Sequence, residues 1–280
     1  VGALNTTQVG ALSATQVGAL NSTDLKALQS TQISGFSTVA LSGFTAAIIT
    51  TLLNTQVQAL NSTQLAALNS TSLNALNTTE VQNLTSTQLS GLTSSQISGL
   101  NSTALNNLTS TQVGQLSTGQ IAALSTTQLN SLSTTNIDAI AVAKMTTSQV
   151  AGLSTTELGK MTTTQAGALS TTQVRALSTS QLNNVVAAYL DALDVTKLST
   201  SQVGGLTATT VQNLTTTEVA ALNSSQIGSM TTSAVAALST TELHALTSTQ
   251  LSGLTSSQVS NLASTVLNNL TSTQVGTLTT

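Results

Sequence analysis

Aliphatic residues recur every eight positions through almost the whole chain. They form three blocks of constant register, at residues 4–140, 145–185 and 198–278, and the register changes by five residues modulo eight between blocks. A fixed short period is typical of repeat proteins in which each unit packs only against its neighbours. We therefore predict a single repeat solenoid over residues 1–280, with a bend or seam at each change of register.

Each repeat starts with an anchor, usually Leu, and a second aliphatic residue follows five positions later. A spacing of five and then three does not fit the alternation of a β-strand. A continuous helix fits badly too, because eight residues would turn the anchor by about 80° per repeat and wind the apolar stripe around the helix. The pattern instead favours one short helical segment per repeat. The residue before each anchor is usually Ala or Gly, which lets neighbouring backbones approach closely.

A helix-capping signal repeats with the same period. The residue after the anchor is nearly always Ser, Thr or Asn, and Gln or Glu follows three positions later. This is the capping box, in which the two residues satisfy each other's backbone N–H groups at a helix N-terminus. We predict an all-α solenoid of short capped helical segments, eight residues per repeat. Representative boxes pair Ser13 with Gln16, Asn61 with Gln64, Ser125 with Gln128, and Ser239 with Glu242.

A β-solenoid is the alternative architecture, because Thr and Val favour strands and short repeats also build β-helices.

One segment departs from the short helices. Between Ser178 and Asp194 the apolar residues follow a helical i, i+3, i+4 spacing, which predicts one longer helix over residues 178–194. An isolated repeat is too short to be stable, so the repeats must stack. Two, three or four repeats per coil are all compatible with the sequence.

Residues 36–53 are unusually apolar, because Ala and Ile replace the Gln of the box. One interpretation is a locally wider core. The other is a contact between subunits, since exposed apolar patches mark interfaces. On the second interpretation, changing Ile48 and Ile49 to Glu should weaken self-association and leave the helix content intact. The candidate contact residues are Phe36, Phe44, Ile48, Ile49, Leu52 and Leu53.

Composition excludes several classes of protein. The chain has five Lys and Arg, eight Asp and Glu, one His and no Cys, and about half of its residues are Ser, Thr, Asn or Gln. Five cations cannot neutralise a run of phosphates, so we expect no nucleic-acid partner. No apolar run reaches the length of a membrane span. Without Cys there is no disulfide framework or Cys-based metal site.

Candidate chemistry is sparse, and we expect neither an enzyme nor a cofactor. His244 lies at a variable position and the sequence places no catalytic group beside it, and a Ser or Thr nucleophile needs an activating base. Asp191 and Asp194 are three residues apart, where a solvated helix face is favoured over a cation site. Tyr189 lies beside them and is the one candidate aromatic for ligand binding. The many Asn-x-Ser/Thr triplets follow from Asn caps, although they also match glycosylation acceptors.

The repeats that begin at Leu124 (Leu-Ser-Thr-Thr-Gln-Leu-Asn-Ser) and at Leu169 (Leu-Ser-Thr-Thr-Gln-Val-Arg-Ala) resemble repeat tracts of large bacterial surface proteins, which are often labelled haemagglutinin or haem-utilisation proteins. The resemblance implies an extracellular or cell-surface location. It carries over no haem site, because the chain has one His and three Met.

We expect a structural protein that self-assembles head-to-tail into a filament or forms a fibre or stalk. The expectation follows from the absence of atypical capping repeats at either end of the sequence, since uncapped solenoid ends are complementary to each other. The alternative is an adhesin module that binds a glycan or another surface through one face of the solenoid.

Overall fold

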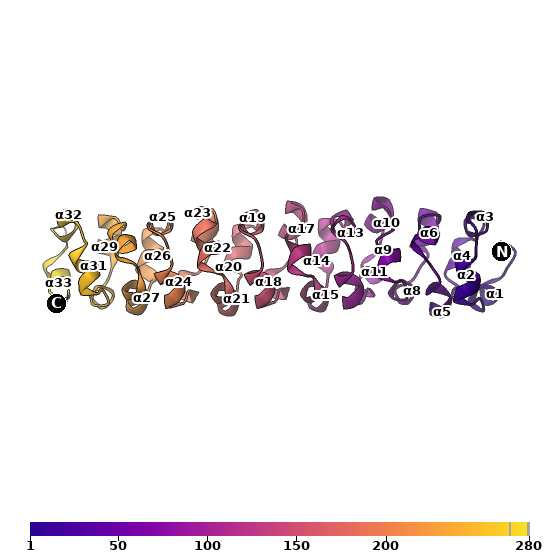
Figure 1. Ribbon diagram of the computed structural model, residues 1–280, viewed down its shortest axis with the longest axis horizontal. Coiled ribbons are helices and arrows are strands. Elements are labelled where there is room, and N and C mark those ends of the chain that lie inside the picture. Colours follow the sequence, from indigo (N-terminus) through magenta and orange to yellow (C-terminus); the bar gives the residue numbers. More distant parts are fainter. Residues whose placement is uncertain (269, 279–280) are drawn as a thin grey trace. The chain divides into compact units, whose positions relative to one another are not determined.

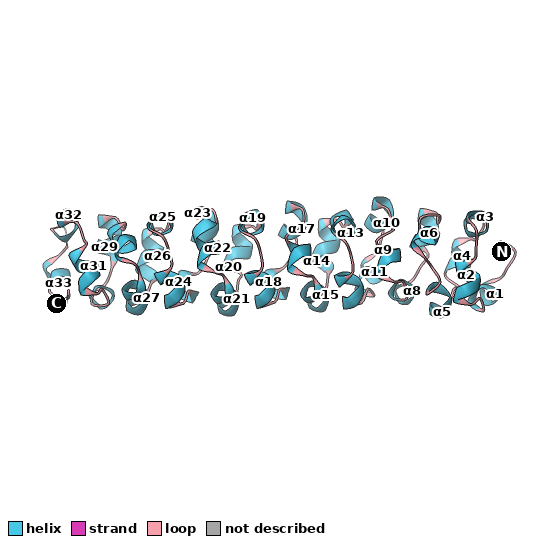
Figure 2. Ribbon diagram, viewed as in Figure 1, coloured by secondary structure: helices cyan, strands magenta, loops and turns pink. Residues whose placement is uncertain are grey.

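The computed structural model describes residues 1–268 and 270–278 of the chain. The chain divides into two compact units, one from Val1 to Met145 and a second that begins at Thr146, and each is considered on its own. In both units the described backbone consists of short helices and the turns that join them (Figure 1, Figure 2). The predicted all-α solenoid of short segments is confirmed. The β-solenoid alternative is wrong, because no strand occurs among the described residues.

The helices are four to six residues long, apart from two 3-10 helices of three residues. In the first unit they are α1 (Thr6–Gly10), α2 (Ala14–Gly18), α3 (Ser22–Lys26), α4 (Ser30–Ile33), α5 (Thr38–Leu41), α6 (Ala46–Ile49), α7 (Asn54–Gln58), α8 (Ser62–Ala66), α9 (Ser70–Leu73), α10 (Thr78–Gln82), α11 (Ser86–Ser90), α12 (Ser94–Ser98), α13 (Ser102–Asn107), α14 (Ser110–Gln115), α15 (Thr118–Ala123), α16 (Thr126–Leu129), α17 (Thr134–Asp138) and η1 (Val142–Lys144). In the second unit the described helices are α18 (Thr147–Ala151), α19 (Thr155–Lys160), α20 (Thr163–Gly167), α21 (Thr171–Ala176), α22 (Thr179–Asn184), α23 (Ala187–Ala192), η2 (Val195–Lys197), α24 (Thr200–Gly204), α25 (Ala208–Gln212), α26 (Thr216–Ala221), α27 (Ser224–Ser229), α28 (Thr232–Ala236), α29 (Thr240–Ala245), α30 (Ser248–Leu251), α31 (Ser256–Ser260), α32 (Ser264–Leu267) and α33 (Ser272–Val275).

The anchor and the residue after it break the helix in every repeat. Leu124, which ends α15, is extended at φ −65° and ψ 133°. Ser125, the N-cap of α16, is also extended at φ −72° and ψ 158°. A polar N-cap favours this conformation because its side chain can then accept a hydrogen bond from the first turn of the next helix. Each helix is therefore limited to little more than one turn, and the chain changes direction once per repeat.

Three helices complete one coil within each unit. In the first unit α1 packs against α4 and α4 against α7, and in the second unit α24 packs against α27 and α27 against α30. A regular coil therefore contains three repeats of eight residues, the number that the sequence left open. The second aliphatic residue and the following anchor both line the interior: Ile121 is 0% exposed and Leu124 is 4% exposed.

The predicted longer helix over residues 178–194 is wrong. The chain forms α22 and α23 there, separated by Val185 and Val186. Both valines are extended, with ψ of 158° and 149°. Val185 is the anchor of its repeat. Leu190 and Leu193 are the buried second aliphatic residue and the next anchor, so the eight-residue period continues unchanged. The helical spacing arose because Val186 replaces the polar cap and makes the repeat resemble an uninterrupted apolar helix.

Both changes of register come from the same device, a repeat shortened to five residues, at 140–145 and 193–198. In each, a 3-10 helix replaces the α-helix, and Val142 or Val195 fills the buried position between two anchors. The helix η1 packs against α15, and η2 packs against α21, so a five-residue repeat still occupies one side of a coil. The seams predicted from the sequence are therefore shortened repeats that preserve three sides per coil.

Several glycines before the anchors mark places where neighbouring coils approach closely. Among the described residues no Gly has a positive φ, so none is needed for a left-handed backbone conformation. A Cβ added to Gly91 would lie 2.9 Å from the carbonyl oxygen of Ser62 and 2.5 Å from its Cβ. A Cβ added to Gly35 would lie 2.9 Å from the carbonyl oxygen of Thr6. This agrees with the predicted role of small residues at this position.

Changing Gly91 to Ala should destabilise the first unit by about 1–3 kcal/mol, because the added methyl group forces apart two packed backbones. Gly119 in α15 is the matched control, since a Cβ there would meet only the Ser94 Oγ, at 3.8 Å. Gly119→Ala should stabilise the unit slightly, through the better helix propensity of Ala. Urea unfolding followed by circular dichroism measures both. Equal effects of the two substitutions would contradict the close-contact interpretation.

Candidate functional site

The predicted capping boxes are present. The Ser13 Oγ accepts a hydrogen bond from the Gln16 N–H at 3.2 Å, and the Gln16 Oε1 accepts one from the Ser13 N–H at 2.9 Å. Reciprocal bonds of the same kind join the other three representative pairs. These pairs are Asn61 with Gln64, Ser125 with Gln128, and Ser239 with Glu242.

The Gln of the box also has a second role, which the capping pattern alone did not predict. The Gln128 Oε1 accepts from the Ser125 N–H at 2.8 Å, while its Nε2 donates to the carbonyl oxygens of Ile97 and Leu100 at 3.1 and 2.7 Å. Ile97 and Leu100 lie 31 and 28 residues earlier, in and just after α12, where helix carbonyls lack partners of their own. One buried amide therefore caps its own helix and also closes the C-terminal end of a helix in the preceding coil.

We call this set of side chains the amide ladder. Each member donates through Nε2 to at least one main-chain carbonyl 25–31 residues earlier in the sequence. A capping box alone accepts Glu as readily as Gln, so the strong preference for Gln was the signal for a required donor. The members include Gln32, Gln56, Gln64, Gln88, Gln96, Gln112, Gln120 and Gln128 in the first unit, and Gln181, Gln202, Gln226, Gln250, Gln258 and Gln274 in the second.

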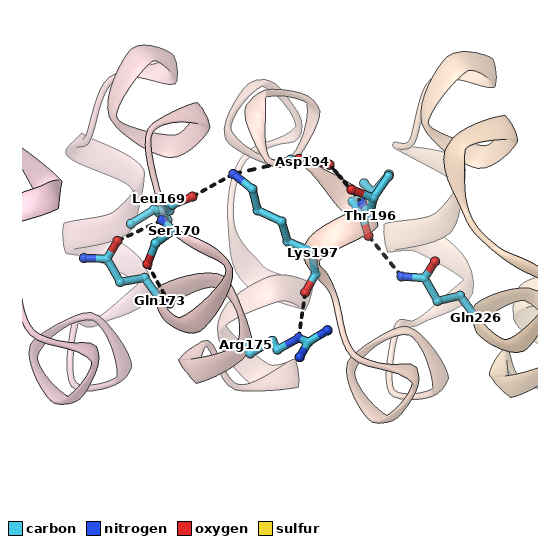
Figure 3. A network of polar contacts seen from close by, with 9 residues as sticks. Leu169, Ser170, Gln173, Arg175, Asp194, Thr196, Lys197 and Gln226 are labelled. Carbon is cyan, nitrogen blue, oxygen red and sulfur yellow. Dashed lines mark hydrogen bonds and ion pairs between the residues drawn. The ribbon is translucent and has the colours of Figure 1, made fainter.

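Lysine replaces glutamine in the two shortened repeats. The Lys144 Nζ donates to the carbonyl oxygens of Leu116 and Gly114 at 2.6 and 3.0 Å, and the Lys197 Nζ donates to that of Leu169 at 2.8 Å. Lys197 also lies 3.8 Å from Asp194, which caps η2 (Figure 3). A 3-10 helix of three residues has no position for the Gln, so a longer side chain immediately before the anchor reaches the same carbonyls. Both shortened repeats contain Val-x-Lys, the sequence signal that could have identified them.

Glutamate occupies a few ladder positions, and Glu80, Glu218 and Glu242 accept from the N-cap N–H without donating to the preceding coil. The Glu80 Oε2 accepts from the Asn77 N–H at 2.8 Å, and the side chain is 2% exposed. A carboxylate has no donor for the preceding coil. In the second unit the Glu218 Oε1 is buried without a hydrogen-bond partner. Burial raises the pKa of the Glu80 carboxyl above its ordinary value of 4.5, and the hydrogen bonds from Asn77 oppose that rise. Burial therefore disfavours the charged form of Glu80.

The apolar stretch at residues 36–53 belongs mainly to the core of the first unit. The rings of Phe36 and Phe44 meet edge to face, 5.4 Å apart at 73°. Of the six candidate contact residues only Leu53 is exposed, at 48%, and Phe36, Phe44, Ile48, Ile49 and Leu52 are buried in their own coils. Ile49 is the second aliphatic residue of its repeat, so a Glu there would place a carboxylate in the core, and we expect the double substitution to reduce helix content instead of selectively weakening self-association.

The remaining candidate residues are not brought together into a site. Tyr189 occupies the position of a ladder Gln and is 2% exposed, which removes it from the surface. Asp194 caps η2, Asp191 is exposed on α23, and His244 is exposed on α29. Within residues 1–268 and 270–278 no group of three or more His, Asp or Glu side chains could hold a metal ion. None of the described helices has both the length and the apolar character needed to cross a bilayer.

Glu80→Gln should stabilise the first unit at pH 7 by about 1–2 kcal/mol, because the new amide can donate to the preceding coil. A raised pKa in the folded state means that the stabilising contribution of Glu80 is complete only below pH 4.5 and is lost as the pH rises through the folded-state pKa. The advantage of Gln should therefore shrink below pH 4.5. Urea midpoints measured from pH 3 to pH 8 test this. Asp138→Asn, an equal charge change on an exposed side chain of the same unit, is the control.

Comparison with known proteins agrees with the repeat architecture. The family model of the ALTTAQ repeat matches residues 142–179, a small part of the chain. Within that match Ala168, Leu169, Thr171 and Gln173 fall at the small, anchor, polar and ladder positions of one repeat. No curated protein matches the chain. The chain therefore contains a tract similar to the ALTTAQ repeat, built as a solenoid of short capped helices.

Proposed function

We propose that this chain is a structural protein of the bacterial cell surface, which assembles head-to-tail into a filament or forms a fibre or stalk. The observation that carries the proposal is the amide ladder. Each coil offers amide donors on one face and main-chain carbonyl acceptors on the opposite face. Two such faces are complementary to each other whether they belong to one chain or to two copies, and a heterologous contact of this kind builds an open polymer.

The first coil presents the donor face. Gln8 and Gln16 are exposed, and each uses its Oε1 in a capping box. Among the described residues their Nε2 groups have no carbonyl partner like those of Gln56 or Gln64, which are buried against the preceding coil. A preceding coil, from the same chain or from another copy, would cover them. In a filament a second copy would supply the carbonyl oxygens for Gln8 and Gln16, and this contact is the same as the one that successive coils make within the chain.

The low charge supports a role as an inert fibre. Only 5% of the residues are charged, so coil stacking depends on amide–carbonyl hydrogen bonds and apolar packing, and neither is strongly screened by salt. The similarity to the ALTTAQ repeat supports a repeat-based structural role. The extracellular location rests on the resemblance of the repeats to tracts of large bacterial surface proteins. No catalytic step is part of this proposal.

A glycan-binding face has less support. Sugar-binding faces commonly use aromatic side chains as stacking surfaces. The chain has two Phe, one Tyr and no Trp, and Phe36, Phe44 and Tyr189 are all buried. Self-association therefore remains the function that the geometry supports best.

Electron microscopy of the purified chain over a range of concentrations tests the assembly. We expect concentration-dependent filaments that persist in moderate salt. The double variant Gln8→Glu with Gln16→Glu keeps both capping acceptors but replaces the two donors by carboxylates. It should abolish filaments without loss of helix content in circular dichroism.

The control for this experiment is Ser95→Glu with Thr111→Glu, which adds the same charge at exposed first-turn positions of α12 and α14. It should assemble like the unaltered chain. Short rods at every concentration, or filaments that the donor variant leaves unchanged, would contradict head-to-tail assembly through the ladder.

A further inference from the structure

Three described repeats lack Gln or Glu at the ladder position and still have their N-cap N–H satisfied. The position holds Ala104 after Asn101, Asn136 after Ser133, and Thr210 after Thr207. In an ordinary repeat the ladder Gln supplies the acceptor, as Gln128 does for the Ser125 N–H. In these three repeats the acceptor must come from elsewhere.

An Asn side chain of the preceding coil supplies it each time. The Asn74 Oδ1 accepts from the Asn101 N–H at 2.9 Å, and the Asn74 Nδ2 donates to the Gly99 carbonyl at 2.9 Å. The amide thus fits two main-chain groups that flank Leu100. Asn106 and Asn183 repeat this geometry. Their Oδ1 atoms accept from the N–H groups of Ser133 at 2.7 Å and Thr207 at 3.0 Å, and their Nδ2 atoms donate to the carbonyls of Ser131 and Gly205, both at 2.8 Å.

The three asparagines share one place in the repeat. Each is the sixth residue after its anchor, and its partner is the N-cap four repeats later. The separation along the sequence is 27 residues for Asn74 and Asn106 and 24 for Asn183. The shorter separation follows from the five-residue repeat at 193–198, which lies between Asn183 and its partner. The pairing therefore follows the coil and not a fixed distance in sequence.

Repeats that precede an intact box behave differently. Ser90 and Ser98 hold the same sixth position, and the N-caps that face them belong to the boxes of Gln120 and Gln128. Their hydroxyls donate back to their own helices, to the carbonyls of Thr87 and Ser95 at 2.9 and 3.0 Å. One N–H fits one short hydrogen bond, and two amide oxygens aimed at it would repel each other. An Asn at the sixth position and a Gln in the facing box are therefore alternatives.

We propose that Asn74, Asn106 and Asn183 set the register of coil stacking, each by pairing selectively with a repeat that lacks the ladder Gln. The eight-residue sequence is otherwise nearly the same along the chain, so apolar packing alone does not distinguish one register from the next. A slip by one repeat would place Asn74 against the box of Gln96 or of Gln112, where the N-cap N–H already has an acceptor. A single polar residue that fixes register has a precedent in coiled coils.

The residue that replaces the ladder Gln makes only some of the hydrogen bonds that a Gln would make, and the paired Asn makes the others. The Asn136 Nδ2 still donates to the carbonyls of Leu105 and Leu108, at 3.3 and 3.1 Å, but its side chain is too short to return to the Ser133 N–H. Asn106 supplies that acceptor. In the second unit the Thr210 hydroxyl donates to the Asn183 Oδ1 at 2.7 Å and adds a second contact to the same oxygen. The partner residues therefore differ, and the asparagine is the constant part of the pair.

A mutant cycle with Asn74→Ala, Ala104→Gln and the double variant tests the proposal. The readout is hydrogen exchange of the peptide that contains the Asn101 amide, together with the urea midpoint. Asn74→Ala should speed exchange of the Asn101 amide about tenfold, as expected for one lost hydrogen bond. Ala104→Gln should not change exchange of the Asn101 amide while Asn74 is present, and it should restore protection of that amide when Asn74 is Ala.

Ser98→Ala is the matched control, because it alters the same position before an intact box, and it should leave exchange of the Ser125 amide unchanged. If Asn74→Ala prevents folding, Asn183→Ala with Thr210→Gln makes the same measurement in the second unit, at the Thr207 amide. Unchanged exchange at the N-cap amide of the Asn→Ala variant would overturn the proposal. An equal effect of the new Gln with and without the Asn would overturn it as well.

Discussion

The structure depends on satisfying main-chain groups in helices of about one turn. A helix leaves its first four N–H and last four C=O groups without internal partners, so in helices of four to six residues most polar main-chain groups need help from outside. Water cannot provide it where the coils stack. The amide ladder resolves this constraint with one residue type, because Gln carries an acceptor and a donor on the same rigid group. The aliphatic core can then be modest, with two buried side chains per repeat.

The capping boxes within each repeat could be predicted from the sequence, and the hydrogen bonds between coils could not. Capping boxes act over three residues, so the pairs at Ser13, Asn61, Ser125 and Ser239 were correctly identified. Three repeats per coil, and the bonds from Gln128 to Ile97 and Leu100, depend on which segments meet about 28 residues apart. Nothing in an almost uniform repeat indicates that distance. The predicted longer helix failed for a related reason, since Val186 removed the polar cap that had marked each helix start.

The candidate contact at residues 36–53 shows that an apolar composition alone does not distinguish a core segment from an exposed contact surface. Ala and Ile at the ladder position suggested an exposed apolar patch that binds another subunit. In the structure Ile48 is buried between coils, at the position where most repeats have Gln. An apolar residue has no need to reach a carbonyl, so the local coil packs through its side chains instead. Val39 and Leu53, which fall at normally polar positions, are the exposed large apolar residues of this stretch. Position within the repeat, more than hydrophobicity, decides which side chains are buried.

The closure of a coil by three repeats constrains how such a gene can change length. Gain or loss of one eight-residue repeat would move every later segment to the next side of the coil, and would separate Asn74 from the repeat that accepts it. Gain or loss of three repeats would return each later segment to its own side. A change of length by three repeats therefore leaves the fold of each later coil unchanged. Only the hydrogen-bonded pairs that span the point of insertion or deletion are interrupted. The five-residue repeats show a second permitted step, a deletion of three residues that needs only a lysine to remain compatible with the stack.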